Sequence, residues 1–519
     1  MLEERILNIT KEAVEIYSPT NTAAERKIED YLLGVLREMP YFQQHPELCG
    51  ACVLADDRWQ RSCIYGLVLG KSRRTVLYMG HHDVVDTDVY GSLAQIATQP
   101  EQLAQELLKT VLDKETQEDL MSGQWLFGRG TCDMKGGTAA QLAVMEQYAN
   151  NPDDGCLLFL SVPDEEAFSA GMRGCLPLLQ ELRERYGLEY ELAVNCEPNS
   201  RENGLQMIYT GTVGKMLPCV LVQGRAVQIG SYYEGVNPVA ILAEIVSRTE
   251  GERAFTDWEG QEQTVPPVWN FMRDFKRGYD FSLPRRGGAY CNILTFHKQP
   301  GEVLAWLQDR CCEAAAAVMS KQGTGKYVKV ITYEQLLQAA AAKEDFQHFY
   351  RTLQQDMEKK LLEDKIDFPA LTLWAMEQVL DFTGYDEPII VIGFAPPYYP
   401  PLNSRKLTEK FADIENFVQT LLPVSVKSYF MGISDCSYLG TESISDDAFS
   451  GNAPAWGRLY SFDSEVLAAL QIPFLLLGPW GKDLHQRTER VNIISLCCEL
   501  PSVLQKLNRF VWSKGEKLK

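Results

Sequence analysis

The sequence predicts an α/β fold: a mostly parallel sheet with helices on both faces, interrupted by an inserted α+β domain. Apolar segments of strand length alternate with helix-length segments through the first 200 residues. Polar residues directly follow several of these apolar segments. A different order of elements, with two consecutive strands, begins near residue 211.

The first part of the main domain is expected over residues 1–210. Residues 1–40 have helical spacing of apolar residues, with Asn21 and Thr22 as cap residues between two helices. Strands are expected at residues 62–69, 75–79, 156–162 and 191–196. Helices are expected at residues 91–120, 136–148 and 176–186. Strands and helices that alternate in this way form a mostly parallel sheet covered on both faces.

The inserted domain is expected over residues 211–333, because its order β-α-β-β-α-β is that of a ferredoxin-like unit. Its strands are expected at residues 213–223, 265–270, 288–296 and 327–332, and its helices at 238–248 and 301–319. A helical segment, residues 334–386, is expected to extend this inserted domain, hereafter called the lid. The proline-rich stretch 396–401 is expected to lead back into the second part of the main domain, 387–519, with strands at 425–431 and 473–478 and helices at 407–422 and 494–511.

The bulk composition is that of a folded protein with several domains. The chain has 519 residues, 45% of them hydrophobic, and a net charge of -20. This acidic balance argues against nucleic acid or an anionic membrane as a partner. No apolar run approaches the ~20 residues of a membrane span, and the acidic N-terminus shows no signal peptide. The 14 cysteines are scattered along the chain and several lie in apolar strands, so we expect reduced thiols and a cytoplasmic location.

Polar clusters follow four of the predicted strands. In an open parallel sheet the carboxyl ends of the strands meet at one edge, so these side chains are expected to lie close together. Imidazole and carboxylate are ligands typical of zinc, and the number of groups exceeds what one tetrahedral ion needs. Two ions that share a bridging carboxylate fit this number of ligands better than one ion does. The clusters contain His81 and Asp83, Glu165 and Glu166, Glu197, and His485.

These motifs resemble metallopeptidase family twenty, which contains aminoacylases, succinyl-diaminopimelate desuccinylases and glutamate carboxypeptidases. The matching stretches cover nearly the whole chain in the family's order. The long lid and residues 394–400 resemble the arginine-utilisation branch of this family. The matching stretches are residues 80–85, 128–137, 164–166, 197–198, 434–435 and 485–491.

The resemblance implies two divalent metal ions, with zinc favoured and cobalt or manganese as alternatives. Asp133 would bridge both ions. Glu166 and His485 would complete one site, and His81 and Glu197 would complete the other. A homodimer through the inserted domain is a further expectation of the resemblance.

The resemblance also implies a reaction, the hydrolysis of an amide bond in a small peptide or an N-acyl amino acid. Asp83 would orient the ring of His81. Glu165 would act as general base: it would take a proton from the water between the metals and pass it to the leaving amine.

One position departs from the family pattern. Where the family has a lid histidine that donates to the oxyanion, this sequence has Gln228. Loss of one such donor typically lowers kcat by ~10²–10³. Gln228 could donate this hydrogen bond in place of the histidine and support a lower kcat, or another group could act as the donor. The alternative hypothesis is a metal-binding but catalytically weak or silent relative with a binding or regulatory role; a third is a single-metal structural site.

Other residues are left open by the sequence. The residue that binds a substrate carboxylate is undecided among Arg225, Arg285 and Arg286. His82 is expected to point away from His81, because successive strand residues face opposite sides. Residues 434–435 are expected to be structural.

Overall fold

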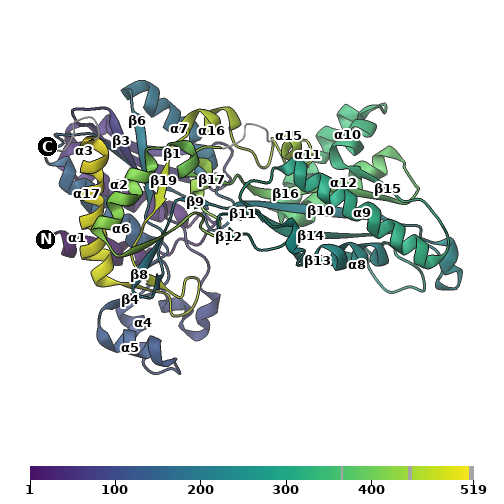
Figure 1. Ribbon diagram of the computed structural model, residues 1–519, viewed down its shortest axis with the longest axis horizontal. Coiled ribbons are helices and arrows are strands. Elements are labelled where there is room, and N and C mark those ends of the chain that lie inside the picture. Colours follow the sequence, from purple (N-terminus) through teal and green to yellow (C-terminus); the bar gives the residue numbers. More distant parts are fainter. Residues whose placement is uncertain (364–365, 442–446, 514–519) are drawn as a thin grey trace. The chain divides into compact units, whose positions relative to one another are not determined.

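The computed structural model describes residues 1–363, 366–441 and 447–513 (Figure 1). The chain divides into two compact units. Unit 1 comprises Met1–Thr212, Leu402–Glu442 and Phe462–Lys519, and unit 2 comprises Val213–Pro401 and Ser443–Ser461. The sequence placed the return to the main domain at residue 387, whereas in this division unit 2 extends to Pro401 and includes a later segment.

Unit 1 is built on a nine-stranded sheet, in the order β1-β2-β5-β3-β6-β19-β8-β18, with β7 paired to β8. The central strands β5, β3, β6 and β19 are parallel, which confirms the predicted fold class. The sequence missed the antiparallel edge strand β1. The strands are β1 (Cys49–Val53), β2 (Ser62–Val68), β3 (Arg74–His81), β5 (Cys156–Val162), β6 (Glu189–Asn195), β7 (Arg201–Glu202), β8 (Leu205–Tyr209), β18 (Val424–Lys427) and β19 (Phe474–Leu476).

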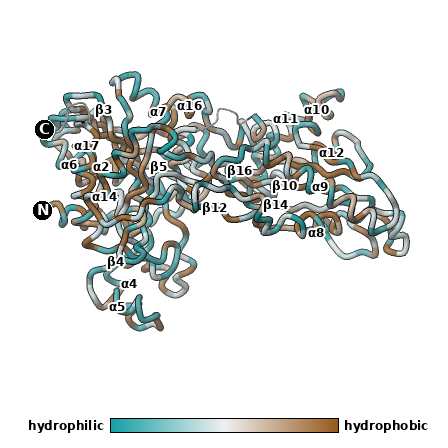
Figure 2. Tube along the Cα trace, in the orientation of Figure 1, coloured by the Kyte–Doolittle hydropathy of each residue, from teal (hydrophilic) through white to brown (hydrophobic). Residues whose placement is uncertain are grey.

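Helices cover this sheet. Every residue of β5 is buried, as expected for a central strand with helices packed over it. Helix α6 packs against β3 and β5, and α2 packs against β2. Hydrophobic residues concentrate along the sheet strands (Figure 2). The main helices are α1 (Leu2–Glu15), α2 (Glu25–Glu38), α6 (Lys135–Ala149), α7 (Ala170–Tyr186), α14 (Phe411–Leu421), α16 (Ser464–Leu470) and α17 (Leu500–Ser513).

Smaller elements complete unit 1. Strands β9 (Gly211–Thr212) and β17 (Leu402–Asn403) pair where the chain leaves and re-enters the unit. Strands β4 (Trp125–Phe127), β20 (Gly481–Lys482) and β21 (Arg490–Asn492) form a three-stranded sheet. The segment predicted to be helical, residues 91–120, contains α4 (Pro100–Leu107) and the start of α5 (Lys114–Ser122), and apolar side chains of this region pack around Trp125 and Phe127.

Unit 2 contains a five-stranded sheet, in the order β13-β14-β10-β16-β15. The predicted strand near 327–332 lies at the edge, and β16, rather than that strand, pairs with β10. The strands are β10 (Gly214–Gln223), β13 (Val268–Asp274), β14 (Arg286–Thr295), β15 (Lys329–Thr332) and β16 (Ile389–Tyr399). The helices are α8 (Pro238–Thr249), α9 (Pro300–Gln322), α10 (Tyr333–Ala341), α11 (Phe346–Leu362) and α12 (Phe368–Thr383).

Residues 396–399 of the proline-rich stretch belong to β16, and Pro400 and Pro401 follow the strand up to the point where unit 1 resumes at Leu402. The β10–β16 ladder is irregular between the pairs Leu217–Ala395 and Lys215–Tyr399. This irregularity accommodates prolines, which cannot donate to the ladder. All eleven residues of β16 are buried, so the strand belongs to the unit 2 core.

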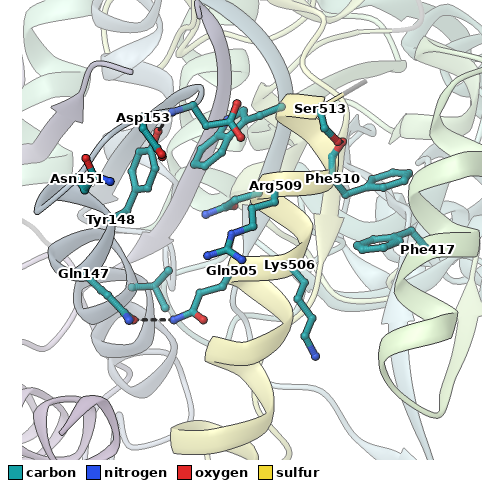
Figure 3. A pocket seen from close by; sticks show the side chains of 14 residues that line it. Gln147, Tyr148, Asn151, Asp153, Phe417, Gln505, Lys506, Arg509, Phe510 and Ser513 are labelled. Atoms are coloured by element: carbon teal, nitrogen blue, oxygen red, sulfur yellow. Dashed lines mark hydrogen bonds between the residues drawn. The ribbon is translucent and has the colours of Figure 1, made fainter. Parts of the chain in front are cut away.

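A pocket of about 690 Å³ lies on unit 1 between α6, α14 and α17. Tyr148 and Asp153 line one side, and Phe417 and Phe510 stack with ring centroids 4.1 Å apart on the other (Figure 3). Asp153 precedes β5, so the pocket lies near the amino end of this strand. The polar clusters follow the carboxyl ends of the strands, so the pocket is separate from the candidate site.

In the part of the chain that the structure describes, no helix combines the length and apolar character needed to cross a membrane.

Candidate metal centre

The parallel strands bring the predicted side chains to one edge of the unit 1 sheet. His81 is the last residue of β3, and Glu197 lies two residues beyond the end of β6. Glu165 and Glu166 follow β5 after a short turn. His485 lies on the loop after β20 with a left-handed backbone (φ 63°). Because β3, β5 and β6 run in the same direction, their carboxyl ends converge.

Asp133 lies between the two histidines. Its Oδ1 is 3.1 Å from Nε2 of His81, and its Oδ2 is 3.0 Å from Nε2 of His485. Asp133 precedes α6, whose first turn contains Gly137. A Cβ on Gly137 would lie 2.2 Å from the carbonyl oxygen of Cys196, so glycine allows α6 to approach the loop that carries Glu197.

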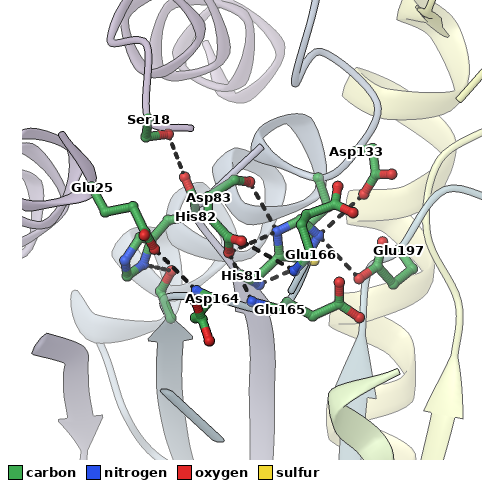
Figure 4. A network of polar contacts seen from close by, with 12 residues as sticks. Ser18, Glu25, His81, His82, Asp83, Asp133, Asp164, Glu165, Glu166 and Glu197 are labelled. Atoms are coloured by element: carbon green, nitrogen blue, oxygen red, sulfur yellow. Dashed lines mark hydrogen bonds and ion pairs between the residues drawn. The ribbon is translucent and has the colours of Figure 1, made fainter. Parts of the chain in front are cut away.

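The other two carboxylates each lie beside one histidine. Oε1 of Glu197 is 3.3 Å from Nε2 of His81, and Oε1 of Glu166 is 3.2 Å from Nε2 of His485. One ligand atom each from His81, Asp133 and Glu166 fall within 4.8 Å of one another. The structure therefore brings all five predicted ligands together, in two sets that share Asp133. Figure 4 shows four of them, namely His81, Asp133, Glu166 and Glu197.

Asp83 lies directly behind the ring of His81. Its Oδ1 is 3.4 Å from Nδ1 of His81, and its backbone carbonyl is 3.0 Å from the same nitrogen. The two side-chain oxygens also accept the backbone N–H groups of Glu165 and Glu166, both at 3.1 Å. Asp83 thus fixes the ring on one side and the two adjacent glutamates on the other.

The charges at this edge favour added cations. Burial raises the pKa of Glu197 to about 8, although His81 opposes the shift. Burial also raises the pKa of Glu166 and holds that of Glu165 well above its usual range. The Asp133 carboxylate raises the pKa of His485 to about 10. Crowded carboxylates that resist ionisation in this way are stabilised by divalent cations, and the nitrogen and oxygen donors suit such ions.

The Glu165 carboxylate is buried and has no hydrogen-bond partner among the described residues. Only 7% of the residue is exposed. Its backbone is fixed by Asp83 while its carboxylate is left available for proton transfer.

The family model described as Peptidase family M20/M25/M40 matches residues 98–466 of this chain. The chain belongs to this peptidase family. The resemblance expected from the motifs is therefore confirmed.

Two curated proteins of Bacillus subtilis (strain 168) are similar over nearly their whole length. YqjN, described as uncharacterized, is 30% identical and aligns over 97% of this chain and 95% of its own. RocB is 26% identical over 97% of this chain and 94% of its own. The solved structure of Bacillus subtilis YXEP, described as a dinuclear metal-binding peptidase from the M20 family, has a TM-score of 0.51 at 9% identity and covers 99% of both chains. At that identity it shows a shared fold.

Sequence reasoning gave no role to one ion pair of this M20-family chain. Arg129 and Glu489 form a buried ion pair, and Oε1 of Glu489 accepts the N–H of Gly130 at 2.7 Å. Nη2 of Arg129 donates to the carbonyl of His485 at 3.2 Å. The pair therefore joins the loop before Asp133 to the loop of His485. Both residues lie inside stretches that match the family motifs, and this position was the sequence signal that could have indicated a role for them.

Among the described residues, His82, Ser434 and Asp435 make no hydrogen bond to any of the five predicted ligands. Nδ1 of His82 is 3.0 Å from Oγ of Ser161, and its Nε2 is 3.9 Å from Oε1 of Glu29. Ser434 caps a short helix: its Oγ accepts the N–H of Cys436 at 3.2 Å. Asp435 is buried, and burial raises its pKa to about 7.

Gln228 and the three candidate arginines belong to unit 2. Gln228 is exposed and directly precedes the short helix Ile229–Glu234. Each arginine is already paired with an acidic side chain of the same unit. The pairs are Arg225 with Glu387 at 2.6 Å, Arg285 with Asp386 at 3.2 Å and Arg286 with Asp381 at 2.6 Å.

Proposed function

We propose that this M20-family chain is a two-metal amidohydrolase that cleaves an amide bond in a small peptide or an N-acyl amino acid. One observation carries the proposal: the two oxygens of Asp133 face different histidines, 3.1 and 3.0 Å away. A carboxylate shared in this way is the central ligand of a two-metal site. The description of the YXEP structure as a dinuclear metal-binding peptidase supports it.

The five side chains would hold the ions in two sets. His81, Glu197 and one oxygen of Asp133 form the first set, and His485, Glu166 and the other oxygen form the second. We propose zinc, with cobalt or manganese as alternatives, because imidazole and carboxylate donors accept all three. Bound there, the ions would supply Lewis-acid activation of the scissile carbonyl and of the attacking water.

The chain's own groups would move the protons. Glu165 would take a proton from the attacking water and deliver it to the leaving amine, because its carboxylate is unbonded within the described residues and its pKa is raised by burial. Asp83 would keep the ring of His81 and the backbone of Glu165 in place.

Gln228 supports a second candidate, a metal-binding relative with little or no catalysis that serves a binding or regulatory role. A glutamine amide donates a hydrogen bond but brings no charge to an oxyanion, so kcat would be lower than with histidine. The unbonded carboxylate of Glu165 favours the hydrolase, since a silent relative needs no free base.

Assembly and location are parts of the same proposal. Strand β13 is one of the two edge strands of the unit 2 sheet, and Val268 and Met272 on it are 40% and 43% exposed. Such an edge favours pairing with a second copy of the chain. All 14 cysteines are free, which suits the reducing cytoplasm. The similarity to RocB supports the arginine-utilisation branch.

The test is amine release from a panel of dipeptides and N-acyl amino acids, with protein loaded with zinc, cobalt or manganese. Glu165→Gln is expected to abolish turnover and to keep both metals. Glu15→Gln, at the exposed end of α1, is the matched control and is expected to keep turnover. Two metals per chain without turnover on any substrate would favour the silent relative. Failure to bind metal would overturn both candidates.

A further inference from the structure

The turn that carries Glu165 and Glu166 begins at Asp164, whose backbone is left-handed (φ 71°). Left-handed backbone is unfavourable for most residues, so the turn needs support from its surroundings. The carbonyl of Asp164 accepts the N–H of Ser169 at 2.7 Å, and its Oδ2 accepts the N–H of Ala170, the first residue of α7, at 3.1 Å. Asp164 is therefore the anchor of this turn.

Arg61 holds that anchor. It is 3% exposed and precedes β2, which pairs with β5. Its Nη1 lies 2.7 Å from Oδ1 of Asp164 and 2.8 Å from Oε1 of Glu25. The opposite edge of the guanidinium binds Asp57, with Nη2 2.6 Å from Oδ2. A planar guanidinium with partners on both edges has a fixed orientation, which an ammonium group cannot reproduce.

Glu25 closes the arrangement on the other side of Asp164. Its Oε2 accepts the backbone N–H of Asp164 at 3.0 Å (Figure 4). Its Oε1 accepts a hydrogen bond from Nη1 of Arg61 and another from the backbone N–H of Thr22, the latter at 3.2 Å. The backbone and the side chain of Asp164 are thus both fixed by one buried cluster.

The next two residues along the turn bind a different group. The N–H groups of Glu165 and Glu166 donate to Asp83, which lies against Nδ1 of His81. A continuous chain of contacts therefore runs from Arg61 through Asp164 to the two glutamates.

We propose that Arg61 is a positioning residue: through Asp164 it fixes the turn that presents the Glu165 carboxylate and the Glu166 ligand. This rests on the proposed two-metal function. A displacement of ~1 Å at a reacting group costs up to ~10²-fold in rate, so small movements of this turn have large effects. A purely structural cluster would change stability and leave the metal geometry unchanged.

The test uses the cobalt-loaded protein, whose visible absorption reports the ligand geometry, together with kcat and KM. Arg61→Lys keeps the positive charge but loses the planar guanidinium, with its donors on two edges. We expect it to bind two cobalt ions with a changed visible spectrum, and to lower kcat about 10- to 100-fold with KM within about threefold. Arg74→Lys is the matched control, because Arg74 forms an ion pair with Glu191 at 3.1 Å and lies at the start of β3, at the opposite end of the strand from His81. We expect it to keep the wild-type spectrum and kcat.

A wild-type spectrum and kcat in Arg61→Lys would overturn the proposal, as would equal changes in Arg74→Lys. If Arg61→Lys does not fold, Asp164→Asn takes its place, because asparagine tolerates left-handed backbone. We expect Asp164→Asn to fold with the same spectral change; an unchanged spectrum would overturn the proposal. If wild-type protein binds cobalt but turns over no substrate, the spectra still decide the role of Arg61 separately from the hydrolase proposal.

Discussion

The carboxylate of Asp83 accepts the backbone N–H of Glu165 at 3.1 Å. Through this bond one side chain serves two parts of the centre, because the same carboxylate also lies 3.4 Å from the ring of His81. The group that orients the ring of His81, a proposed metal ligand, therefore also sets the position of the proposed base.

Replacing Asp83 by asparagine tests this double role. Asparagine keeps the shape but presents an NH₂ group to one of the two backbone N–H groups, so one bond to Glu165 or Glu166 is lost. We expect a 10- to 100-fold loss of metal affinity or of activity, as is typical for partners of metal ligands. Metal titration and kcat measure it. Asp88→Asn, at an exposed position, is the control. If Asp83→Asn had the metal affinity and kcat of the wild type, the double role of Asp83 would be contradicted.

Metal stoichiometry distinguishes a shared ligand from an unshared one. Asp133 faces both histidines, whereas Glu197 lies beside His81. We expect Asp133→Asn to lose both ions and Glu197→Gln to lose one, since a bridging ligand belongs to two coordination sets. Metal analysis after dialysis gives the number of ions per chain. Two ions retained by Asp133→Asn would exclude the bridging role.

The ion pair of Arg129 and Glu489 predicts a large effect on stability. Arg129→Met leaves a buried carboxylate without its cation, and we expect the free energy of unfolding to fall by about 3–5 kcal/mol. The double variant Arg129→Met/Glu489→Gln is expected to recover most of this loss, because glutamine is neutral and still accepts the N–H of Gly130. Urea unfolding of the two single variants and the double variant measures the coupling. Additive losses would show that the two side chains are not coupled.

The sequence predicted the centre better than it predicted the support around it. Three of the five predicted ligands, His81, Glu166 and Glu197, lie at or just beyond the ends of parallel strands, and these ends meet. The other two, Asp133 and His485, follow strands of the separate three-stranded sheet, and the motif resemblance indicated them. The supporting pairs depend on distant contacts: Arg61 and Asp164 are 103 positions apart, and Arg129 and Glu489 are 360 apart. A charged residue has many possible partners at such separations, and only the tertiary structure selects one.

The assignment of one strand shows a second limit. The sequence predicted no strand between residues 387 and 424, where β16 lies, and the apolar character of residues 389–394 fits the core of either sheet. The register with β10 places this strand in unit 2, and the proline pair lies at an irregularity of that ladder. Periodicity indicates that a strand exists but does not identify the strand beside which it lies.

Glu29 gives a prediction for pH. It is buried, and its Oε1 has no hydrogen-bond partner within the described residues. Burial raises its pKa from an ordinary 4.5 to about 7, against the opposing effect of the Ser62 backbone. Between these values the folded state binds more protons than the unfolded chain, so the contribution of Glu29 to stability is present below pH 4.5 and is lost as the pH rises through 7.

Glu29→Gln removes this titration. We expect the variant to gain stability over the wild type on going from pH 5 to pH 8, by on the order of 1–2 kcal/mol after allowance for solvent screening. Urea unfolding of metal-loaded protein at both pH values measures the difference. Glu15→Gln, with an exposed carboxylate, is the control and should show no such gain. An equal difference from the wild type at both pH values would show that Glu29 does not titrate in this range.

Gln228 decides how far this chain departs from the usual family chemistry. A histidine at this position would offer a charged donor to the oxyanion, whereas the glutamine amide is neutral. We expect Gln228→His to raise kcat by about 10- to 100-fold if the proposed oxyanion role is correct, with KM changed less. Steady-state kinetics on the best substrate of the panel measures it. Gln338→His, at an exposed site on α10, controls for an added histidine. An unchanged or lower kcat would mean that glutamine is the functional residue here, and that the chemistry of this chain does not depend on a cation at this position.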